Sequence, residues 1–470
     1  MHAAKEPSRT FLLFVTGVTL ILTSRSLLSD GMFVDGLLYA TISKNLAGGL
    51  GTWWNLHFSA TLYPQFHEHP PLAFWIESIL YRLFGDSRFI ERIYSVSTFI
   101  LTGLLILKIW RHSGRRHGWI PVGLWLSIPL VMWAIPSNML ENTLTVFTTL
   151  SMLMYLKSTG RRRFLFILLS GLSLSLGFLT KGFVAFFPWT FPFFLWLALR
   201  QKTFTGMLAD TGMMALFTAV PVLVLALAIP EAGVSLQKYL DTQVLNSLQN
   251  VVTVDSRFYI VKNLLTQLIP PAALCLLVTL IVWRRKASLQ PLRDLRSQGS
   301  AWFLTAMAGV LPIMLSMKQR EFYLLPVFPV FALAFGSYIY PLLEMPLSKI
   351  RTETKAFRWF RLVSLALVAA GILLSLWYAP KIGRDKVKLN DTYAILPRIP
   401  SGTTVSILPQ MYGDWGLHGY FARYKNISLE PGTGREYLLV SSEFQPDPET
   451  LKNYMEVGLG TTKYHLMKRR

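Results

Sequence analysis

The sequence predicts a mainly α-helical, polytopic membrane protein with a small α/β domain at its C-terminal end. Three observations support this fold class. Of 470 residues, 52% are hydrophobic and only 15% are charged, whereas a soluble domain carries about 25% charged residues. Apolar runs long enough to cross a bilayer recur between residues 11 and 379. The basic residues fall in short clusters between those runs.

Eleven apolar runs are candidate transmembrane helices. They fall at about 11–28, 93–110, 119–136, 142–157, 164–180, 183–199, 207–229, 263–283, 301–317, 322–341 and 361–379. The first run follows Lys5 and Arg9, as the apolar part of a signal peptide does. It is long enough to span, and no Ala-x-Ala cleavage site follows it, which favours a retained helix.

The basic clusters predict the orientation. They comprise Lys5 and Arg9; Arg111, Arg115 and Arg116; Lys157 and Arg161 to Arg163; Arg200 and Lys202; Arg284 to Lys286, Arg293 and Arg296; and Lys349, Arg351, Lys355, Arg358 and Arg361. If all eleven runs span, every cluster lies on one side, as cytoplasmic loops require. We therefore expect a multi-pass protein of the inner (plasma) membrane, with a cytoplasmic N-terminus and an extracytoplasmic C-terminal domain.

The net charge of +21 does not indicate nucleic acid as a partner. The basic residues are dispersed among apolar runs, and no motif of a nucleic-acid-binding fold is present. Positive charge between spans is better explained by topology, and membrane lipids are the expected partner of such a protein. The single cysteine, Cys275, lies inside an apolar run, so no disulfide within the chain is possible.

The chain divides into two predicted domains, residues 1–379 in the membrane and residues 380–470 outside it. The longest outer loop, residues 30–92, is here called the first loop. Within it, Asp35 to Asn45 predicts a helix that stops at Gly48, and Pro70-Pro71 opens a second helix that runs to Phe84. We expect the apolar face of that second helix, with Phe74, Trp75, Ile79 and Leu83, to lie on the membrane surface.

The C-terminal segment, residues 380–470, is here called the tail. Its polar composition and its β-type runs Thr404–Leu408 and Tyr437–Val440 predict strands, and Asp414 to Tyr424 predicts a helix between them. A segment of this length holds a modest core. No catalytic motif is evident in it.

Acidic and histidine residues gather at the outer ends of the runs. Asp30 and Asp35 follow the first run, where partial desolvation makes a carboxylate more basic, although each also suits a helix cap. Glu68 lies between His67 and His69; the triplet allows a metal site or an acidic group at a helix start. Glu141 starts an apolar run and is either functional or directed at lipid headgroups.

Basic residues lie at the same boundary. Lys181 stands between two apolar runs, and Lys318 and Arg320 stand between two later runs. Such cations can hold a phosphate, or extend towards lipid headgroups. Carboxylates and cations together are what a site needs if it deprotonates an acceptor and stabilises a leaving phosphate.

These residues resemble the motifs of the bacterial GT-C glycosyltransferases related to the lipid A aminoarabinose transferase and the protein O-mannosyltransferases. The motifs occur in family order over residues 10 to about 340. They are Asp35 with Tyr39; Phe66 to Leu72 followed by Phe74-Trp75; Arg92; Glu141 with Leu144 and Phe147; Leu179 to Gly182; and Lys318 through Tyr323 to Pro326.

Three positions depart from the family pattern. Gly36 follows Asp35 where an acidic pair is common, His69 replaces a lysine before Pro-Pro, and Glu141 replaces an aspartate. A phosphate contact at His69 would titrate near neutral pH. The departures concern the donor and the acceptor more than the reaction class.

The resemblance implies an inverting transfer of a sugar from a polyprenyl-phosphate donor to a hydroxyl or phosphate acceptor on lipid A, another envelope glycan or a protein. Asp35 would act as general base, with Glu141 as a second catalytic carboxylate. The donor phosphate and substrates would contact Lys181, Lys318, Arg320, Tyr323, His69, Tyr39 and Glu68. If a divalent cation binds, Glu68 and His69 are the residues that would hold it, and the resemblance implies no other cofactor.

Two other classes share parts of this pattern. A transporter or flippase of lipid-linked sugars would share the cations and the spans, but it would favour inverted repeats, and no internal repeat is evident. A non-catalytic envelope-assembly protein would not require Asp35. The large first loop with its carboxylates favours the enzyme.

Overall fold

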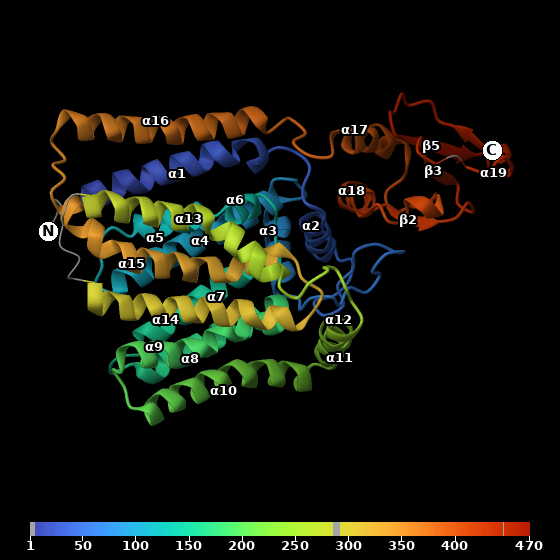
Figure 1. The fold of residues 1–470 in the computed structure, drawn as a ribbon. Helices are drawn as coiled ribbons and strands as arrows, with labels where there is room; N and C mark the ends of the chain where they lie inside the picture. Colours follow the sequence, from blue (N-terminus) through green and yellow to red (C-terminus); the bar gives the residue numbers. More distant parts are fainter. Residues whose placement is uncertain (1–4, 285–291, 445) are drawn as a thin grey trace.

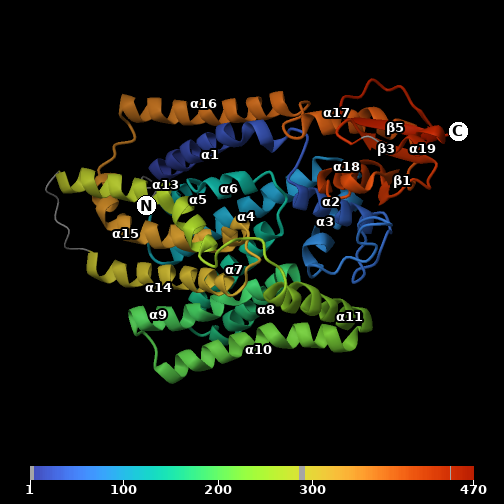
Figure 2. The ribbon, with the colours of Figure 1, turned by 45° about the vertical axis from the view of Figure 1, so that its right-hand side comes forward.

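A computed structural model describes residues 5–284, 292–444 and 446–470. It shows a bundle of helices that run along one direction, with the tail at one end and the N-terminus at the other (Figure 1). The first loop lies between the bundle and the tail in two views (Figures 1 and 2). We call this end of the bundle the tail end.

Helices dominate the bundle because its segments are continuous apolar runs whose backbone groups must be satisfied internally. The helices are α1 (Lys5–Leu27), α4 (Ile90–His112), α5 (Trp119–Leu126), α6 (Pro129–Ala134), α7 (Leu140–Lys157), α8 (Arg163–Lys181), α9 (Phe191–Leu199), α10 (Phe204–Ala228), α11 (Pro230–Tyr239), α12 (Asn246–Gln249), α13 (Tyr259–Arg284), α14 (Leu292–Val310), α15 (Phe328–Ser348) and α16 (Lys355–Tyr378).

Eight helical segments in the described residues are long and apolar enough to cross a membrane, so this is a multi-pass membrane protein, but the predicted count of eleven is not confirmed. The segments are Pro7–Leu27, Ile90–His112, Arg163–Leu199, Phe204–Ala228, Tyr259–Arg284, Gln298–Leu315, Glu321–Ser348 and Lys355–Tyr378. In the predicted basic clusters, Arg285 and Lys286 lie outside the described residues.

Three local features account for the difference in count. The run 142–157 forms α7, which is not among the eight segments. The run 119–136 is interrupted at Ser127 and Ile128 and forms the two short helices α5 and α6. The runs 164–180 and 183–199 form one continuous helical segment that turns back at Gly182, whose φ of +75° suits glycine. Lys181 therefore lies at the tail end, whereas Leu199 lines a cavity with His112 at the opposite end.

The helix α1 packs along α16 on one side of the bundle (Figure 1). Glycines allow the two backbones to approach closely, as is typical of helix pairs in membranes. A Cβ added at Gly17 would lie 2.7 Å from the Cβ of Leu367, and one added at Gly371 would lie 2.5 Å from the Cβ of Leu20.

The first loop contains the two predicted helices, α2 (Val34–Ala47) and α3 (Leu72–Phe84). Gly48 and Gly85 follow their last residues, as predicted. The prediction of a single membrane-facing surface on α3 is wrong for Phe74, which is fully buried in a core with residues of α2. Ile79 and Leu83 on the same helix are exposed, so only the later turns of α3 present an apolar surface.

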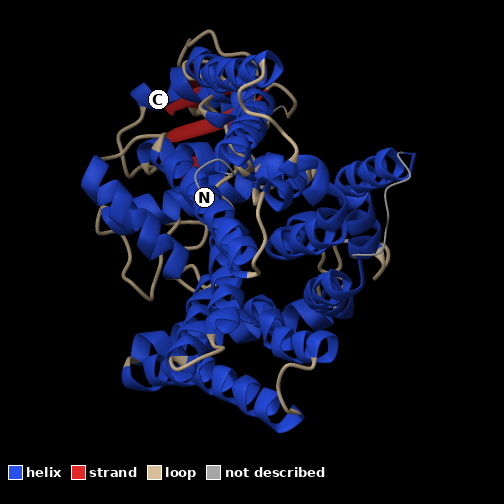
Figure 3. Cartoon of the chain, turned by 90° about the vertical axis from the view of Figure 1, so that its left-hand side faces the viewer, coloured by secondary structure: helices blue, strands red, loops and turns tan. Residues whose placement is uncertain are grey.

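The tail contains a five-stranded sheet in the order β2-β1-β3-β5-β4, in which β1 is parallel to β2 and β3, and β5 is antiparallel to β3 and β4 (red strands in Figure 3). The strands are β1 (Thr404–Ile407), β2 (Ser428–Pro431), β3 (Tyr437–Ser441), β4 (Tyr454–Glu456) and β5 (Tyr464–Arg469). The helices are α17 (Lys386–Ile395), α18 (Trp415–Lys425) and α19 (Pro448–Lys452). The predicted strands and helix of the tail are confirmed.

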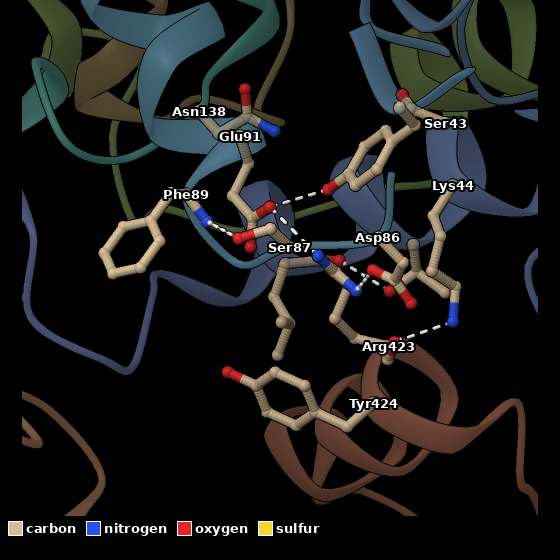
Figure 4. Close-up of polar contacts among 12 residues, drawn as sticks. Ser43, Lys44, Asp86, Ser87, Phe89, Glu91, Asn138, Arg423 and Tyr424 are labelled. Carbon is tan, nitrogen blue, oxygen red and sulfur yellow. Dashed lines mark hydrogen bonds and ion pairs between the residues drawn. The ribbon is translucent and has the colours of Figure 1, made fainter. Parts of the chain in front are cut away.

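A buried polar cluster joins the tail to the first loop (Figure 4). Arg423 of α18 pairs with Glu91 at 3.1 Å and with Asp86 at 2.6 Å. Lys44 of α2 donates to the carbonyl oxygens of Ala422 and Arg423 at the end of α18. Because carbonyls at a helix end lack intrahelical partners, this lysine satisfies them and holds α18 on α2.

Candidate active site

A cavity of about 490 Å³ opens at the tail end of the bundle. Most of its wall is apolar and comes from the segment after α8 and from the end of α14 and the turn after it. The apolar lining includes Phe183, Phe186, Phe187, Ala308, Pro312 and Ile313. Its polar lining comes from His69, Glu141, Lys181, Tyr239, Gln243, Ser247, Lys318 and Tyr323. The cavity thus joins an apolar channel to a small polar region.

Glu141 and Lys181 form a buried ion pair in that polar region. Glu141 lies in the first turn of α7 and is 1% exposed, and Lys181 is the last residue of α8. The ammonium of Lys181 also lies 5.2 Å from the ring centre of Tyr323, a cation–π distance. Glu141 faces the protein interior and the cavity, so it does not point towards headgroups. Its Oε2 has no hydrogen-bond partner among the described residues.

Asp35 is the second residue of α2, and it lies close enough to the Glu141–Lys181 pair for both charges to act on its carboxyl group. Burial raises the pKa of its carboxyl to about 6, an effect that the positive charge of Lys181 opposes and the negative charge of Glu141 reinforces. Gly36 places the start of α2 directly on the Ser137 carbonyl, where a Cβ would overlap it. The glycine that departs from the family's acidic pair therefore has a packing role.

Tyr39 and His69 meet across α2 and the loop before α3. The Tyr39 hydroxyl lies 3.3 Å from His69 Nε2. Burial, together with the charges of Lys181 and Lys318, lowers the pKa of His69 well below its usual value. This lowered pKa argues against titration of His69 near neutral pH, because burial and two nearby cations favour the neutral imidazole.

Glu68 accepts a hydrogen bond of 2.8 Å from the Tyr63 hydroxyl. It does not cap α3, which begins at Leu72 without a side-chain cap. Among the described residues, no group of three or more His, Cys, Asp or Glu side chains is arranged to hold a metal ion. Glu68 and His69 thus offer a cation two protein ligands at most, and we derive no step through a metal.

Lys318 extends into the cavity from the turn after α14. Its ammonium donates to Gln243 Oε1 at 2.6 Å and to Ser247 Oγ at 3.2 Å. Burial lowers the pKa of Lys318, although the carboxylate of Glu68 opposes this effect. Arg320, two residues after Lys318 in the sequence, is exposed, and its positive charge acts on the carboxyl group of Asp35.

The sequence did not identify the lining residues Tyr239, Gln243 and Ser247. They lie in the predicted outer loop 231–262, where polar residues are common and carry no distinguishing pattern. The structure brings them to the cavity because α11 packs beside the end of α8, where the Tyr239 hydroxyl lies 3.5 Å from the Lys181 carbonyl oxygen.

Two other sequence candidates have structural partners. Asp30 accepts hydrogen bonds from Tyr424, at 2.6 Å, and from Tyr393, and it pairs with Arg88 at 2.9 Å. Although burial acts in the opposite sense, these bonds lower the pKa of Asp30. Asp30 therefore anchors the tail. Arg92 donates to the carbonyl oxygens of Ser29 and Gly31 and fixes the chain before α2.

Sequence comparisons show related proteins over part of the chain. Residues 68–225 match the family model described as dolichyl-phosphate-mannose-protein mannosyltransferase. The undecaprenyl phosphate-alpha-4-amino-4-deoxy-L-arabinose arabinosyl transferase 1 of Proteus mirabilis is 34% identical over 159 residues, 32% of this chain and 28% of the relative. The corresponding transferase of Aeromonas salmonicida is 32% identical over 155 residues, 31% of this chain and 27% of the relative. The matches span less than a third of these relatives.

Comparison of structures extends the similarity to the whole fold. ArnT from Cupriavidus metallidurans, solved bound to undecaprenyl phosphate, aligns over 97% of both chains with a TM-score of 0.64 and 16% identity. The apo oligosaccharyltransferase of Archaeoglobus fulgidus aligns over 96% of this chain and 74% of that one, with a TM-score of 0.52 and 12% identity. The chain thus has the fold of ArnT, and residues 68–225 are similar to the mannosyltransferase family, which confirms its resemblance to the GT-C membrane glycosyltransferases.

Proposed function

We propose that this protein is an inverting glycosyltransferase that moves a sugar from a polyprenyl-phosphate donor to an acceptor hydroxyl or phosphate on lipid A, another envelope glycan or a protein. The observation that carries the proposal is the shape and charge of the cavity. An apolar wall leads to Lys181 and Lys318. Asp35, a carboxylate of raised pKa that does not itself line the cavity, lies close enough to Lys181 for that charge to act on it. This combination fits a lipid chain that ends in a phosphate.

The donor would bind with its isoprenoid chain along Phe183, Phe187 and Ile313. Its phosphate would lie against the ammonium groups of Lys181 and Lys318. The two lysines differ in availability, because Lys181 is shared with Glu141, whereas the hydrogen-bond partners of Lys318 in the described part of the chain, Gln243 and Ser247, are neutral. A phosphate group is a stronger acceptor than these neutral side chains.

In the transfer, the acceptor oxygen attacks the anomeric carbon as the bond from that carbon to the phosphate oxygen breaks. The bonding electron pair leaves with the polyprenyl phosphate, whose charge Lys181, Lys318 and Arg320 stabilise. Asp35 takes the acceptor proton. With a pKa of about 6, Asp35 is ionised at neutral pH yet more basic than an ordinary aspartate, as a general base should be.

Glu141 has two roles in this proposal. One oxygen holds the ammonium of Lys181 in place. The other, Oε2, is left without a partner among the described residues and is free to accept a hydrogen bond from a substrate hydroxyl. Tyr39, held by His69, and Glu68, held by Tyr63, would border the sugar on the side of the first loop.

The proposal places the tail end outside the cytoplasm, in an inner membrane, with the N-terminus inside. The basic residues support this orientation. Arg111, Arg163, Arg200 and Lys202 belong to helix ends remote from the tail, and a cytoplasmic surface is where such residues concentrate.

The test uses the purified full chain in detergent with a panel of polyprenyl-phosphate sugars, and it measures release of polyprenyl phosphate. Asp35→Asn keeps the size of the side chain and removes its basicity, and turnover should fall roughly a hundredfold or more. Asp255→Asn is the matched control, because Asp255 is exposed in the predicted outer loop and is not part of the cavity. Its turnover should equal that of the wild type.

The outcomes separate the three classes. An enzyme releases polyprenyl phosphate and loses turnover with Asp35→Asn. A flippase releases none but moves labelled donor between the leaflets of a reconstituted vesicle, and an assembly protein does neither. Full turnover in Asp35→Asn would exclude Asp35 as the base.

A further inference from the structure

Glu77 is a buried carboxyl group that contacts α2, which bears Asp35, and the turn before α7, which bears Glu141. It lies on α3 and is 2% exposed. Its Oε2 lies 2.7 Å from the Ser43 hydroxyl of α2, and its Oε1 accepts from Asn138 Nδ2 at 2.9 Å. Asp35 is on α2, and Asn138 is in the turn that leads into α7, where Glu141 lies. Glu77 therefore lies where α2 and the start of α7 meet.

The hydrogen atoms available in this cluster bear on the protonation state of Glu77. A serine hydroxyl has one hydrogen to donate. Ser43 Oγ lies 3.0 Å from the carbonyl oxygen of Tyr39, which can only accept. If Ser43 donates to that carbonyl, its contact with Glu77 requires a hydrogen from the carboxyl group.

The orientation of Asn138 is fixed by the same reasoning. Its amide nitrogen lies 3.3 Å from the Gly36 carbonyl oxygen, another obligate acceptor, and 2.9 Å from Glu77 Oε1. Both amide hydrogens are thereby used. With a protonated Glu77, the chain of bonds runs from Asn138 to Glu77 Oε1, from Glu77 Oε2 to Ser43, and from Ser43 to the Tyr39 carbonyl.

We infer that Glu77 is a protonated, neutral carboxylic acid and that it is a positioning residue, which sets the place of Asp35 relative to Glu141 through Ser43 and Asn138. The Asn138 amide reaches the backbone of Gly36, the residue after Asp35. Asn138 itself adopts a left-handed conformation with φ of +50°, which only a well-supported turn maintains.

The charged neighbours of Glu77 act in opposite senses, because Glu91 raises the pKa of its carboxyl group and Arg423 lowers it, and burial, the largest cause, favours the neutral form. Glu91 of α4 repels a second negative charge, and Arg423 of α18 is already engaged by Glu91 and Asp86 (Figure 4). The Tyr81 hydroxyl donates to Glu91 at 2.6 Å, and the Tyr94 hydroxyl lies 2.6 Å from Thr143 Oγ1. No ion pair with Glu77 exists among the described residues. An unpaired charge buried this deeply is strongly disfavoured, and burial raises the pKa of Glu77 from 4.5 to about 8.

Thermal unfolding as a function of pH tests the protonation state without reference to catalysis. In Glu77→Gln, the amide donates to Ser43 and accepts from Asn138 at every pH. A group whose pKa is raised in the folded state loses its stabilising effect as pH rises through that pKa. The melting temperature of the wild type should therefore fall relative to Glu77→Gln by about 3 °C or more between pH 5 and pH 9.

The opposite result is equally clear. If Glu77 is ionised in the folded protein, the difference between wild type and Glu77→Gln stays constant from pH 5 to pH 9, and the inference is overturned. The matched control is Ser78→Ala on the same helix. Ser78 is fully buried, and its hydroxyl bonds only to the Trp75 carbonyl, so this variant should follow the pH dependence of the wild type.

A second measurement tests positioning, and it rests on the proposed function. Glu77→Leu removes both bonds, and we expect kcat for polyprenyl-phosphate release to fall roughly tenfold or more while the KM for donor stays close to that of the wild type. Glu77→Gln should restore kcat. Equal kcat in Glu77→Leu and wild type would overturn the positioning role, as would an equal loss in both variants. If no variant releases product, the pH dependence of unfolding still decides the protonation state.

Discussion

The buried pair Glu141–Lys181 allows a sharp prediction from a double-mutant cycle. The two side chains are 1% and 7% exposed, so each depends on the other for compensation of its charge. Lys181→Met alone leaves a buried carboxylate without a counter-ion, and such a change destabilises by about 3–5 kcal/mol. Glu141→Gln alone leaves a buried ammonium and should destabilise by a similar amount.

The double variant removes both charges and retains much of the side-chain volume. Replacement of a buried ion pair by neutral groups is close to neutral for stability. Since the double variant should cost close to nothing and each single variant about 3–5 kcal/mol, we expect a coupling free energy of about 6–10 kcal/mol between the two positions. A chain of 470 residues has an unfolding entropy of about 1 kcal/mol/K, so each single variant should melt about 3–5 °C below the wild type.

The assay is thermal unfolding of the four purified proteins in one detergent at one pH. The expected result is two low melting temperatures for the single variants and near-recovery in the double variant. Additive losses in the double variant would refute the reasoning, because they would mean that the two charges do not compensate each other in the folded protein.

The remaining predictions concern pH and the tail. Turnover should increase with pH, with an apparent pKa of about 6, since Asp35 must lose its proton to act as base. At pH 5 turnover should be about one tenth of its plateau value. A pH–rate profile without this increase would contradict Asp35 as base. Arg423→Met leaves Glu91 buried and unpaired and should cost about 3–5 kcal/mol in thermal unfolding. Asp86→Asn changes a carboxylate that is itself 55% exposed and should cost at most about 1 kcal/mol; equal losses in both variants would contradict this interpretation of the cluster.

The sequence predicted local structure well because local signals determine it. Gly48 and Gly85 end α2 and α3, and Asp414 precedes α18 as its N-cap, whose side chain accepts from the Leu417 amide. Each of these signals acts within a few residues. The number of spans was less predictable, because the hydropathy of a run does not show where it breaks, as at Ser127.

The arrangement of the site depends on contacts that the sequence does not encode locally. The sequence marked Asp30 and Asp35 alike as carboxylates after the first run. The structure separates them, because Tyr393 and Tyr424 reach back from the tail to Asp30 and leave Asp35 near Lys181. Glu77 reads as an ordinary polar residue on an amphipathic helix, and only the packing of α3 against α2 shows that it is buried.

The Lys44 contact with the end of α18 has a consequence for biogenesis. During synthesis α2 leaves the ribosome early. The carbonyls of Ala422 and Arg423, which accept hydrogen bonds from Lys44 of α2, follow some 380 residues later. At typical elongation rates this interval is on the order of tens of seconds. Throughout that time the helix that bears Asp35 lacks its tail contacts. An unfinished chain therefore inserts its helices into the bilayer before the region around Asp35 is fully assembled.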